Sequence, residues 1–164
     1  MMKSNKIISD FGDEWEKFNF SNFDKDKLYK IFLDYFDIFP FDKINSESVG
    51  FDLGGGTGRW SQFIAPKVKQ INFVEPSTAI KVAKQNLKNF QNISYINTEI
   101  SHNLFQHNSQ DFGYCLGVLH HTKNPLQNLS YCVSFLKQDS PFLLYLYYKL
   151  ENRSIIYRLI WETI

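Results

Sequence analysis

The sequence contains little cysteine, no long apolar run and no excess of charge of one sign. Its two cysteines, Cys115 and Cys132, stand outside any CxxC or Cys/His spacing, so we expect no disulfide scaffold, no metal site and a reduced, cytoplasmic protein. The most apolar run, residues 142–148, is far shorter than the roughly 20 residues that a membrane helix needs. A net charge of +1 does not indicate a nucleic-acid-binding surface. Function is therefore expected to depend on a local site.

The chain length of 164 residues fits one domain, and an aromatic content of 17% provides large side chains for its core. Asn124 is expected to cap the helix that it begins, and Pro40 to end the first helix. Strands separated by helix-length connections predict a Rossmann-like, doubly wound α/β fold, with a mostly parallel sheet and helices on both faces. Apolar periodicity predicts strands at 48–53, 70–75, 92–97, 111–119 and 142–148, and helices at 24–39, 59–66, 77–89, 124–137 and 152–164.

The most informative segment is a strand that runs directly into four glycines, Gly54, Gly55, Gly56 and Gly58. Glycine adopts positive φ and has no side chain, so a ligand can lie directly against the backbone there. A tight strand-to-helix turn without a ligand is the other interpretation, but such a turn does not need four glycines. The sequence therefore favours a ligand-binding loop.

Three kinds of nucleotide-binding loop compete for these glycines. A P-loop requires Lys followed by Ser or Thr, and neither pair follows here. A dinucleotide loop requires a third glycine at the position of Arg59, which disfavours NAD without excluding it. The third kind is an acid followed by GxGxG, a pattern that Asp52 and the following glycines satisfy.

With this loop the sequence resembles the class I S-adenosylmethionine-dependent methyltransferases. An acid ends the second strand in Asn72–Pro76, and Asp111–His121 is similar to the D-x-x-x-x-x-G-V-L-H-H segment of that family. The resemblance implies an enzyme that uses S-adenosylmethionine, with the methionine portion on the loop, the ribose hydroxyls on Glu75 and the adenine near Glu99; a carboxylate can accept both donors of a diol. The cofactor-binding residues that it implies are Asp52, Gly54, Gly55, Gly56, Gly58, Glu75, Pro76, Glu99, Leu116 and Gly117.

The N-terminal segment Phe11–Trp15 looks like the start of a methyltransferase subgroup in which this segment covers the cofactor. Such a cover implies that Trp15 and Arg59 approach the amino acid end of the cofactor, although Trp15 suits an ordinary core equally well. We interpret the chain as one methyltransferase-like domain. It comprises an N-terminal helical cap (1–45), a cofactor-binding core (46–150) and a partial C-terminal helix (151–164).

His120 and His121 are the candidate catalytic residues. They follow the fourth strand, and the carboxyl ends of strands face the ligand crevice of an open α/β sheet. A histidine with a pKa near neutrality can take a proton from a hydroxyl or amine acceptor, and His120 is our first choice; capping or packing is the other interpretation. The sequence does not identify the acceptor, for which we expect a small molecule or a sugar or lipid precursor. Tyrosines among residues 145–148 either line its pocket or, as we favour, pack.

The run at 142–148 is apolar on both faces, which is typical of an interior strand. The resemblance implies two further strands after it, and the sequence to Ile164 provides none. We expect either a truncated chain or a homodimer or partner chain that covers this edge. The functions that the sequence leaves open are an active methyltransferase, an inactive or partner-dependent cofactor-binding fragment and, least favoured, an NAD-dependent enzyme.

Overall fold

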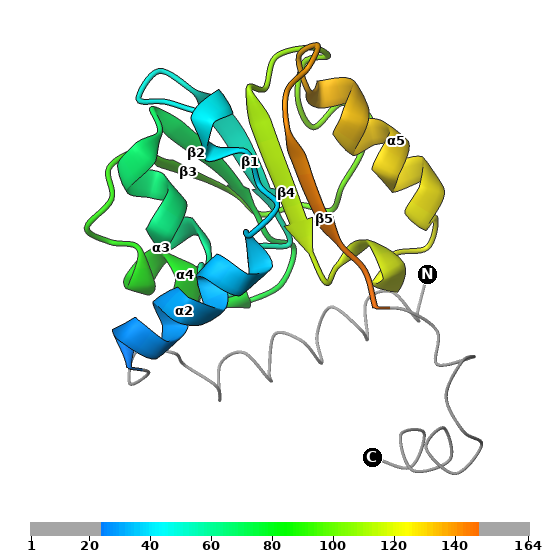
Figure 1. Ribbon diagram of the computed structural model, residues 1–164. Coiled ribbons are helices and arrows are strands. Elements are labelled where there is room, and N and C mark those ends of the chain that lie inside the picture. The colour runs from blue at the N-terminus through cyan, green and yellow to red at the C-terminus, as the bar shows by residue number, and fades with distance from the viewer. Residues whose placement is uncertain (1–23, 148–164) are drawn as a thin grey trace, which may run out of the picture.

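The computed structural model describes residues 24–147, which form one parallel sheet with helices on both faces (Figure 1). The sheet has five strands in the order β3-β2-β1-β4-β5, and all neighbouring strands are parallel. This arrangement confirms the predicted doubly wound α/β fold. The strands are β1 (Val49–Leu53), β2 (Gln70–Val74), β3 (Ile93–Ile96), β4 (Phe112–Leu116) and β5 (Phe142–Tyr145).

The helices follow the predicted order but are shorter than predicted. Helix α2 ends at Tyr35, well before Pro40, because the chain turns there and brings Phe39 back into the core. Asn124 precedes α5, but its side chain donates to Gln127 Oε1 at 3.5 Å and caps no backbone N–H. The α-helices are α2 (Lys25–Tyr35), α3 (Ser61–Ile64), α4 (Ala79–Asn86) and α5 (Pro125–Phe135), and the 3-10 helices are η2 (Phe41–Lys43), η3 (Ala65–Lys67) and η4 (Leu119–His121).

The helix predicted at 59–66 contains only the four α-helical residues of α3. Turns extend from the glycines through Trp60, so Arg59 and Trp60 lie outside the helix. Pro66 falls within η3, which continues directly from α3. The helix predicted at 152–164 lies outside the described residues.

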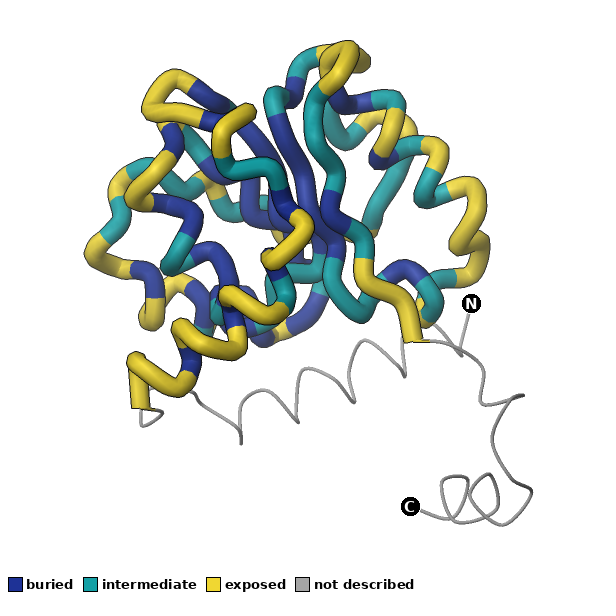
Figure 2. Tube along the Cα trace, viewed as in Figure 1, coloured by how far each residue is buried: buried dark blue, intermediate teal, exposed yellow. Residues whose placement is uncertain are grey.

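The sheet separates two cores, because successive residues of a strand point to opposite faces. Helices α2, α3 and α4 cover one face and α5 covers the other (Figure 1). On the first face, Phe32 of α2 and Ile64 of α3 belong to the same core as Tyr114 of β4. On the second face, Phe135 of α5 packs against Phe51 of β1. Figure 2 shows the most continuous buried stretches in the central strands between these helices.

Two glycine–phenylalanine contacts on opposite faces of the sheet join β1 to β4. In the strand register, Gly50 lies opposite Phe112 and Phe51 lies opposite Gly113. A Cβ atom on Gly50 would lie 2.4 Å from the Phe112 ring, and one on Gly113 would lie 2.2 Å from the Phe51 ring. Each ring therefore occupies the space that a side chain on the neighbouring strand would need. The contacts fix the register of the two central strands.

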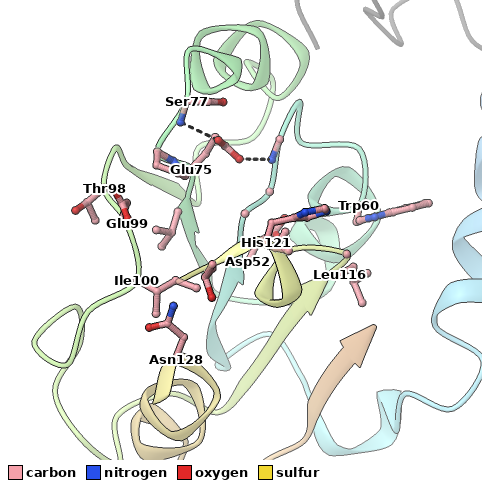
Figure 3. A pocket seen from close by; sticks show the side chains of 18 of the residues that line it. Asp52, Trp60, Glu75, Ser77, Thr98, Glu99, Ile100, Leu116, His121 and Asn128 are labelled. Atoms are coloured by element: carbon pink, nitrogen blue, oxygen red, sulfur yellow. Dashed lines mark hydrogen bonds between the residues drawn. The ribbon is translucent and has the colours of Figure 1, made fainter. Parts of the chain in front are cut away.

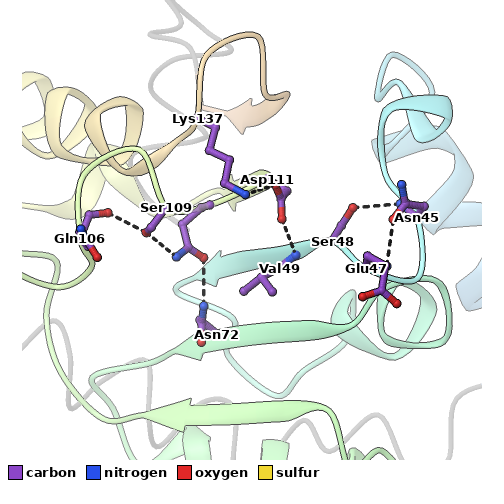
Figure 4. Close-up of polar contacts among 10 residues, drawn as sticks. Asn45, Glu47, Ser48, Val49, Asn72, Gln106, Ser109, Asp111 and Lys137 are labelled. Atoms are coloured by element: carbon purple, nitrogen blue, oxygen red, sulfur yellow. Dashed lines mark hydrogen bonds and ion pairs between the residues drawn. The ribbon is translucent and has the colours of Figure 1, made fainter.

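Polar contacts hold the amino ends of the strands together (Figure 4). Asp111 accepts a hydrogen bond from the backbone N–H of Val49 at 2.8 Å and forms an ion pair with Lys137 at 2.6 Å. Asn72 of β2 donates to Gln110 Oε1 at 2.9 Å. Asp111, the first residue of the segment that ends in the paired histidines, thus stabilises the opposite end of the sheet.

Strand β5 forms one edge of the described sheet and ends at Tyr145, earlier than predicted. Leu143 is buried, whereas Tyr145, Leu146 and Tyr147 are 41%, 45% and 61% exposed. The prediction of a strand covered on both faces is therefore wrong for these three residues: Tyr145 is the exposed last residue of the edge strand, and Leu146 and Tyr147 follow after the chain has left the sheet. Within residues 24–147, no helix is long and apolar enough to cross a membrane.

We expect Gly113→Ala to destabilise the fold. The added methyl group overlaps the Phe51 ring, and overpacking of this kind costs roughly 1–3 kcal/mol. Urea denaturation should show the loss in the free energy of unfolding. Ser94→Ala, on the exposed side of β3, serves as the control and should change this free energy little. A Gly113→Ala variant as stable as the natural protein would contradict the close contact.

Candidate active site

A cavity of about 660 Å³ opens at the carboxyl ends of the strands (Figure 3). Its wall comprises the turn after β1 and the residues that follow β2, β3, β4 and β5. Parallel strands bring these ends to one edge of the sheet, and the order of the strands reverses between β1 and β4. The volume lies within the range of roughly 300–1,000 Å³ that is typical of small-molecule sites.

The glycine turn forms one wall of this cavity. Gly54 has a φ of +73°, and a Cβ atom there would lie 2.4 Å from Val118, so the position excludes a side chain. Gly56 has a φ of 56° and presents its backbone at the cavity. The N–H groups of Gly54 and Gly55 donate to the carbonyl of Val74 at 2.8 and 3.2 Å, which fastens the turn to the end of β2.

Glu75 follows β2 directly, and its carboxylate is held by two backbone donors. Its Oε2 accepts a hydrogen bond from the N–H of Gly56 at 2.9 Å, and its Oε1 accepts one from the N–H of Ser77 at 2.8 Å (Figure 3). The residue is 7% exposed and lines the cavity. Each carboxylate oxygen can accept a second hydrogen bond, so Glu75 retains capacity for two hydroxyl groups of a ligand.

Asp52 lies at the base of the cavity in a buried network of hydroxyl groups. Its Oδ2 accepts a hydrogen bond from Ser61 Oγ at 2.6 Å, and Ser61 Oγ lies 2.8 Å from the hydroxyl of Tyr114. Burial raises the pKa of Asp52 from 3.8 to about 7, although the hydrogen bonds of Ser61 and Tyr114 lower it. Asp52 therefore changes its charge near neutral pH.

The structure brings most of the expected cofactor-binding residues into the cavity wall. Gly58 is the exception among the glycines, because it packs against Leu87 at the end of α4. Glu99 lies in the wall with its side chain exposed. Arg59 also lies in the wall, and its Cζ is 4.1 Å from the centroid of the Trp60 ring. Trp15 lies outside the described residues. The expected residues in the wall are Asp52, Gly54, Gly55, Gly56, Arg59, Glu75, Pro76, Glu99, Leu116 and Gly117.

The structure places the two histidines differently. His121 lines the cavity, whereas His120, our first choice for the base, does not. The His120 ring lies 4.0 Å from that of His121 and 4.6 Å from that of Tyr147, and neither of its ring nitrogens has a hydrogen-bond partner within residues 24–147. Burial lowers the pKa of both histidines, and the neighbouring His121 lowers that of His120 further. His121 is thus the neutral imidazole at the cavity.

Sequence reasoning missed two aromatic residues of the cavity wall, Tyr35 and Trp60, which fall within the helices predicted at 24–39 and 59–66. Tyr147, for which packing was favoured over a place in the pocket, also lines the cavity. The ring of Tyr35 lies 4.9 Å from that of Trp60. A sequence signal existed only for Trp60 and Tyr147, because each follows the carboxyl end of a strand, after the glycine turn in one case and directly after β5 in the other.

Several solved structures have a similar fold. A candidate methyltransferase of Bacillus halodurans C-125 has 21% identity and a TM-score of 0.62, over 69% of this chain and 49% of that chain. The YcgJ protein of Bacillus subtilis has 21% identity and a TM-score of 0.60, over 74% of this chain and 50% of that chain. Haemonchus contortus phosphoethanolamine N-methyltransferase 1, in complex with phosphoethanolamine and S-adenosylhomocysteine, has 15% identity and a TM-score of 0.65. The similarity covers 84% of this chain and 31% of that chain. The chain spans half or less of the length of these proteins.

No curated protein is significantly similar to the chain in sequence. The methyltransferase domain family, however, matches residues 51–144, which is more than half of the chain. The match includes the glycine turn, Glu75 and the histidine pair. The family expected from the sequence is therefore confirmed: the chain belongs to the methyltransferase domain family.

Proposed function

We propose that this protein binds S-adenosylmethionine in the cavity and directs the transfer of its methyl group to a small molecule. The observation that carries the proposal is the carboxylate of Glu75, which is fixed at the cavity wall by Gly56 and Ser77. Its two oxygens suit the vicinal hydroxyl groups of a ribose. The family of the chain and its structural similarity to methyltransferases support the same function.

The residues of the cavity fit the groups of this cofactor. Gly54 and Gly56 place backbone without side chains in the cavity wall, against which the methionine portion can lie, and Asp52 provides a carboxylate for its ammonium group. Glu99 follows β3 and is the proposed contact of the adenine, and Arg59 supplies a cation for the carboxylate of the methionine portion. Each residue is assigned by its place on the wall and by its charge.

Few catalytic side chains are needed for this reaction. When bound, the cofactor would supply a methyl group on a sulfonium sulfur, whose carbon–sulfur bond breaks as the acceptor bonds to the methyl carbon, so that the sulfur leaves as a neutral thioether. The wall holds the acceptor in line, and positioning of this kind provides most of the acceleration. His121 is neutral near pH 7 because burial lowers its pKa, and one of its ring nitrogens can accept the proton that the acceptor loses. We therefore assign the base to His121 instead of His120.

We infer that a second copy or a partner chain covers the open edge of β5 beside the exposed Tyr145 and Leu146, because a sheet edge with apolar side chains favours association. Cys115 and Cys132 are both free and buried, and burial raises the pKa of each thiol. Such unreactive thiols support the expected reducing, cytoplasmic environment.

Isothermal titration with S-adenosylhomocysteine tests the binding site. We expect the natural protein to bind it, and Glu75→Gln to weaken binding roughly 10- to 100-fold, because an amide nitrogen cannot accept the hydrogen bond of Gly56 or Ser77. Glu47→Gln is the matched control, since Glu47 is exposed, lies outside the cavity wall and forms an ion pair with the surface residue Lys69. Binding of NAD without binding of S-adenosylhomocysteine would contradict the proposal.

A second test uses the ionisation of Asp52. Because its pKa in the folded protein, about 7, exceeds the ordinary 3.8, the folded state binds the proton more tightly than the unfolded chain. The stability from this group is fully present below about pH 4 and is lost as the pH rises through about 7. The free energy of unfolding of the ligand-free protein should therefore fall by roughly 3 kcal/mol between about pH 5 and about pH 8 because of Asp52.

Urea denaturation at several pH values measures this dependence. Asp52→Asn should remove this decrease in the free energy of unfolding, because the amide does not titrate. Asp42→Asn, at an exposed carboxylate, should leave the decrease unchanged. Identical pH profiles for Asp52→Asn and the natural protein would show that Asp52 does not titrate in this range.

A further inference from the structure

One end of the cavity is lined by aromatic rings, which we call the aromatic end. It comprises Tyr35, Trp60, His121 and Tyr147, contributed by α2, the turn before α3, η4 and the residues after β5. The ring of Tyr35 lies 4.9 Å from that of Trp60, and the ring of His121 lies 6.3 Å from that of Tyr147. In Figure 3, Trp60 and His121 lie on the side of the cavity away from Thr98 and Glu99.

The two ends of the cavity differ in charge. The carboxylates of Glu75 and Glu99 belong to the opposite end, and none of the four residues of the aromatic end carries a negative charge. A positive charge lies beside these rings, since the guanidinium of Arg59 is 4.1 Å from the centroid of Trp60. One end thus suits the hydroxyl groups and the base of a nucleoside, and the other suits a second ligand with a different chemistry.

We propose that the aromatic end binds the methyl acceptor and selects a planar aromatic compound that carries a hydroxyl group. The inference rests on the methyl-transfer function proposed above. Aromatic side chains have few rotatable bonds and pack against planar rings in offset or edge-to-face arrangements, which a saturated ring cannot adopt equally well. Tyr147 is 61% exposed, so its ring is accessible to a ligand.

Arg59 disfavours an alkylammonium acceptor at this end. A cage of aromatic rings can bind an ammonium group through the ring faces. Here the guanidinium of Arg59 already occupies a face of Trp60, so that face is not available to a second cation.

Polar groups among the rings match a hydroxyl-bearing acceptor. Burial raises the pKa of Tyr35, whose hydroxyl therefore stays protonated and can donate a hydrogen bond. The neutral imidazole of His121 can accept one. A phenolic hydroxyl group, which both donates and accepts, satisfies these two residues together.

The experiment measures binding to the protein saturated with S-adenosylhomocysteine, after binding of S-adenosylhomocysteine itself has been recorded. The probes are 4-hydroxybenzoate, its saturated counterpart 4-hydroxycyclohexanecarboxylate, and tyramine, which is a phenol with an ammonium group. We expect 4-hydroxybenzoate to bind roughly tenfold more tightly than either of the others. The first comparison tests planarity and the second tests charge.

A pair of neighbouring variants locates the probe. Tyr147→Ala should weaken binding of 4-hydroxybenzoate roughly tenfold and leave binding of S-adenosylhomocysteine within about twofold. Leu146→Ala is the control, because Leu146 is 45% exposed and does not line the cavity. Both positions are exposed, so neither variant is expected to unfold the protein.

The outcomes separate this inference from the proposed function. Absence of binding of S-adenosylhomocysteine would overturn both. Binding of S-adenosylhomocysteine would sustain the proposed function, while equal binding of the saturated probe, tighter binding of tyramine, no binding of any probe or an unaffected Tyr147→Ala variant would each overturn the aromatic acceptor alone.

Discussion

The register of β1 against β4 determines where the functional groups of this protein lie. Two phenylalanine rings cover the backbone of Gly50 and Gly113, and the same register places Asp52 opposite Tyr114. A shift by one residue would turn every side chain of β1 to the other face of the sheet and would take Asp52 away from Ser61 and Tyr114. The packing of two glycines therefore controls the chemistry at the end of the same strands.

Besides Glu99, the cavity wall contains two carboxylates, Glu75 and Asp52, whose surroundings give them different properties. Glu75 accepts hydrogen bonds from the backbone N–H groups of Gly56 and Ser77, which are fixed dipoles. Asp52 is more deeply buried and depends on hydroxyl groups, and burial raises its pKa to about 7. The one group is suited to constant recognition of neutral hydroxyls, and the other to a charge that responds to a bound cation.

The sequence was sufficient to predict the order of the strands and helices, the glycine turn and the place of Glu75, because each depends on local periodicity or on the end of a strand. It was not sufficient to choose between His120 and His121. Adjacent residues of a 3-10 helix point about 120° apart, and whether a chain forms this helix or another turn depends on its packing. Nor does sequence separate glycines that pack from glycines that line the cavity: Gly58 lies against Leu87 instead of the cavity.

The two backbone hydrogen bonds to Glu75 also affect the entropy of binding. A glutamate side chain that is free in solution loses up to roughly 2 kcal/mol of rotamer freedom when it is fixed. Glu75 loses this freedom while the protein folds, because Gly56 and Ser77 hold it before any ligand arrives. A diol that meets this carboxylate consequently associates with a rigid partner, and less conformational entropy is lost at that moment.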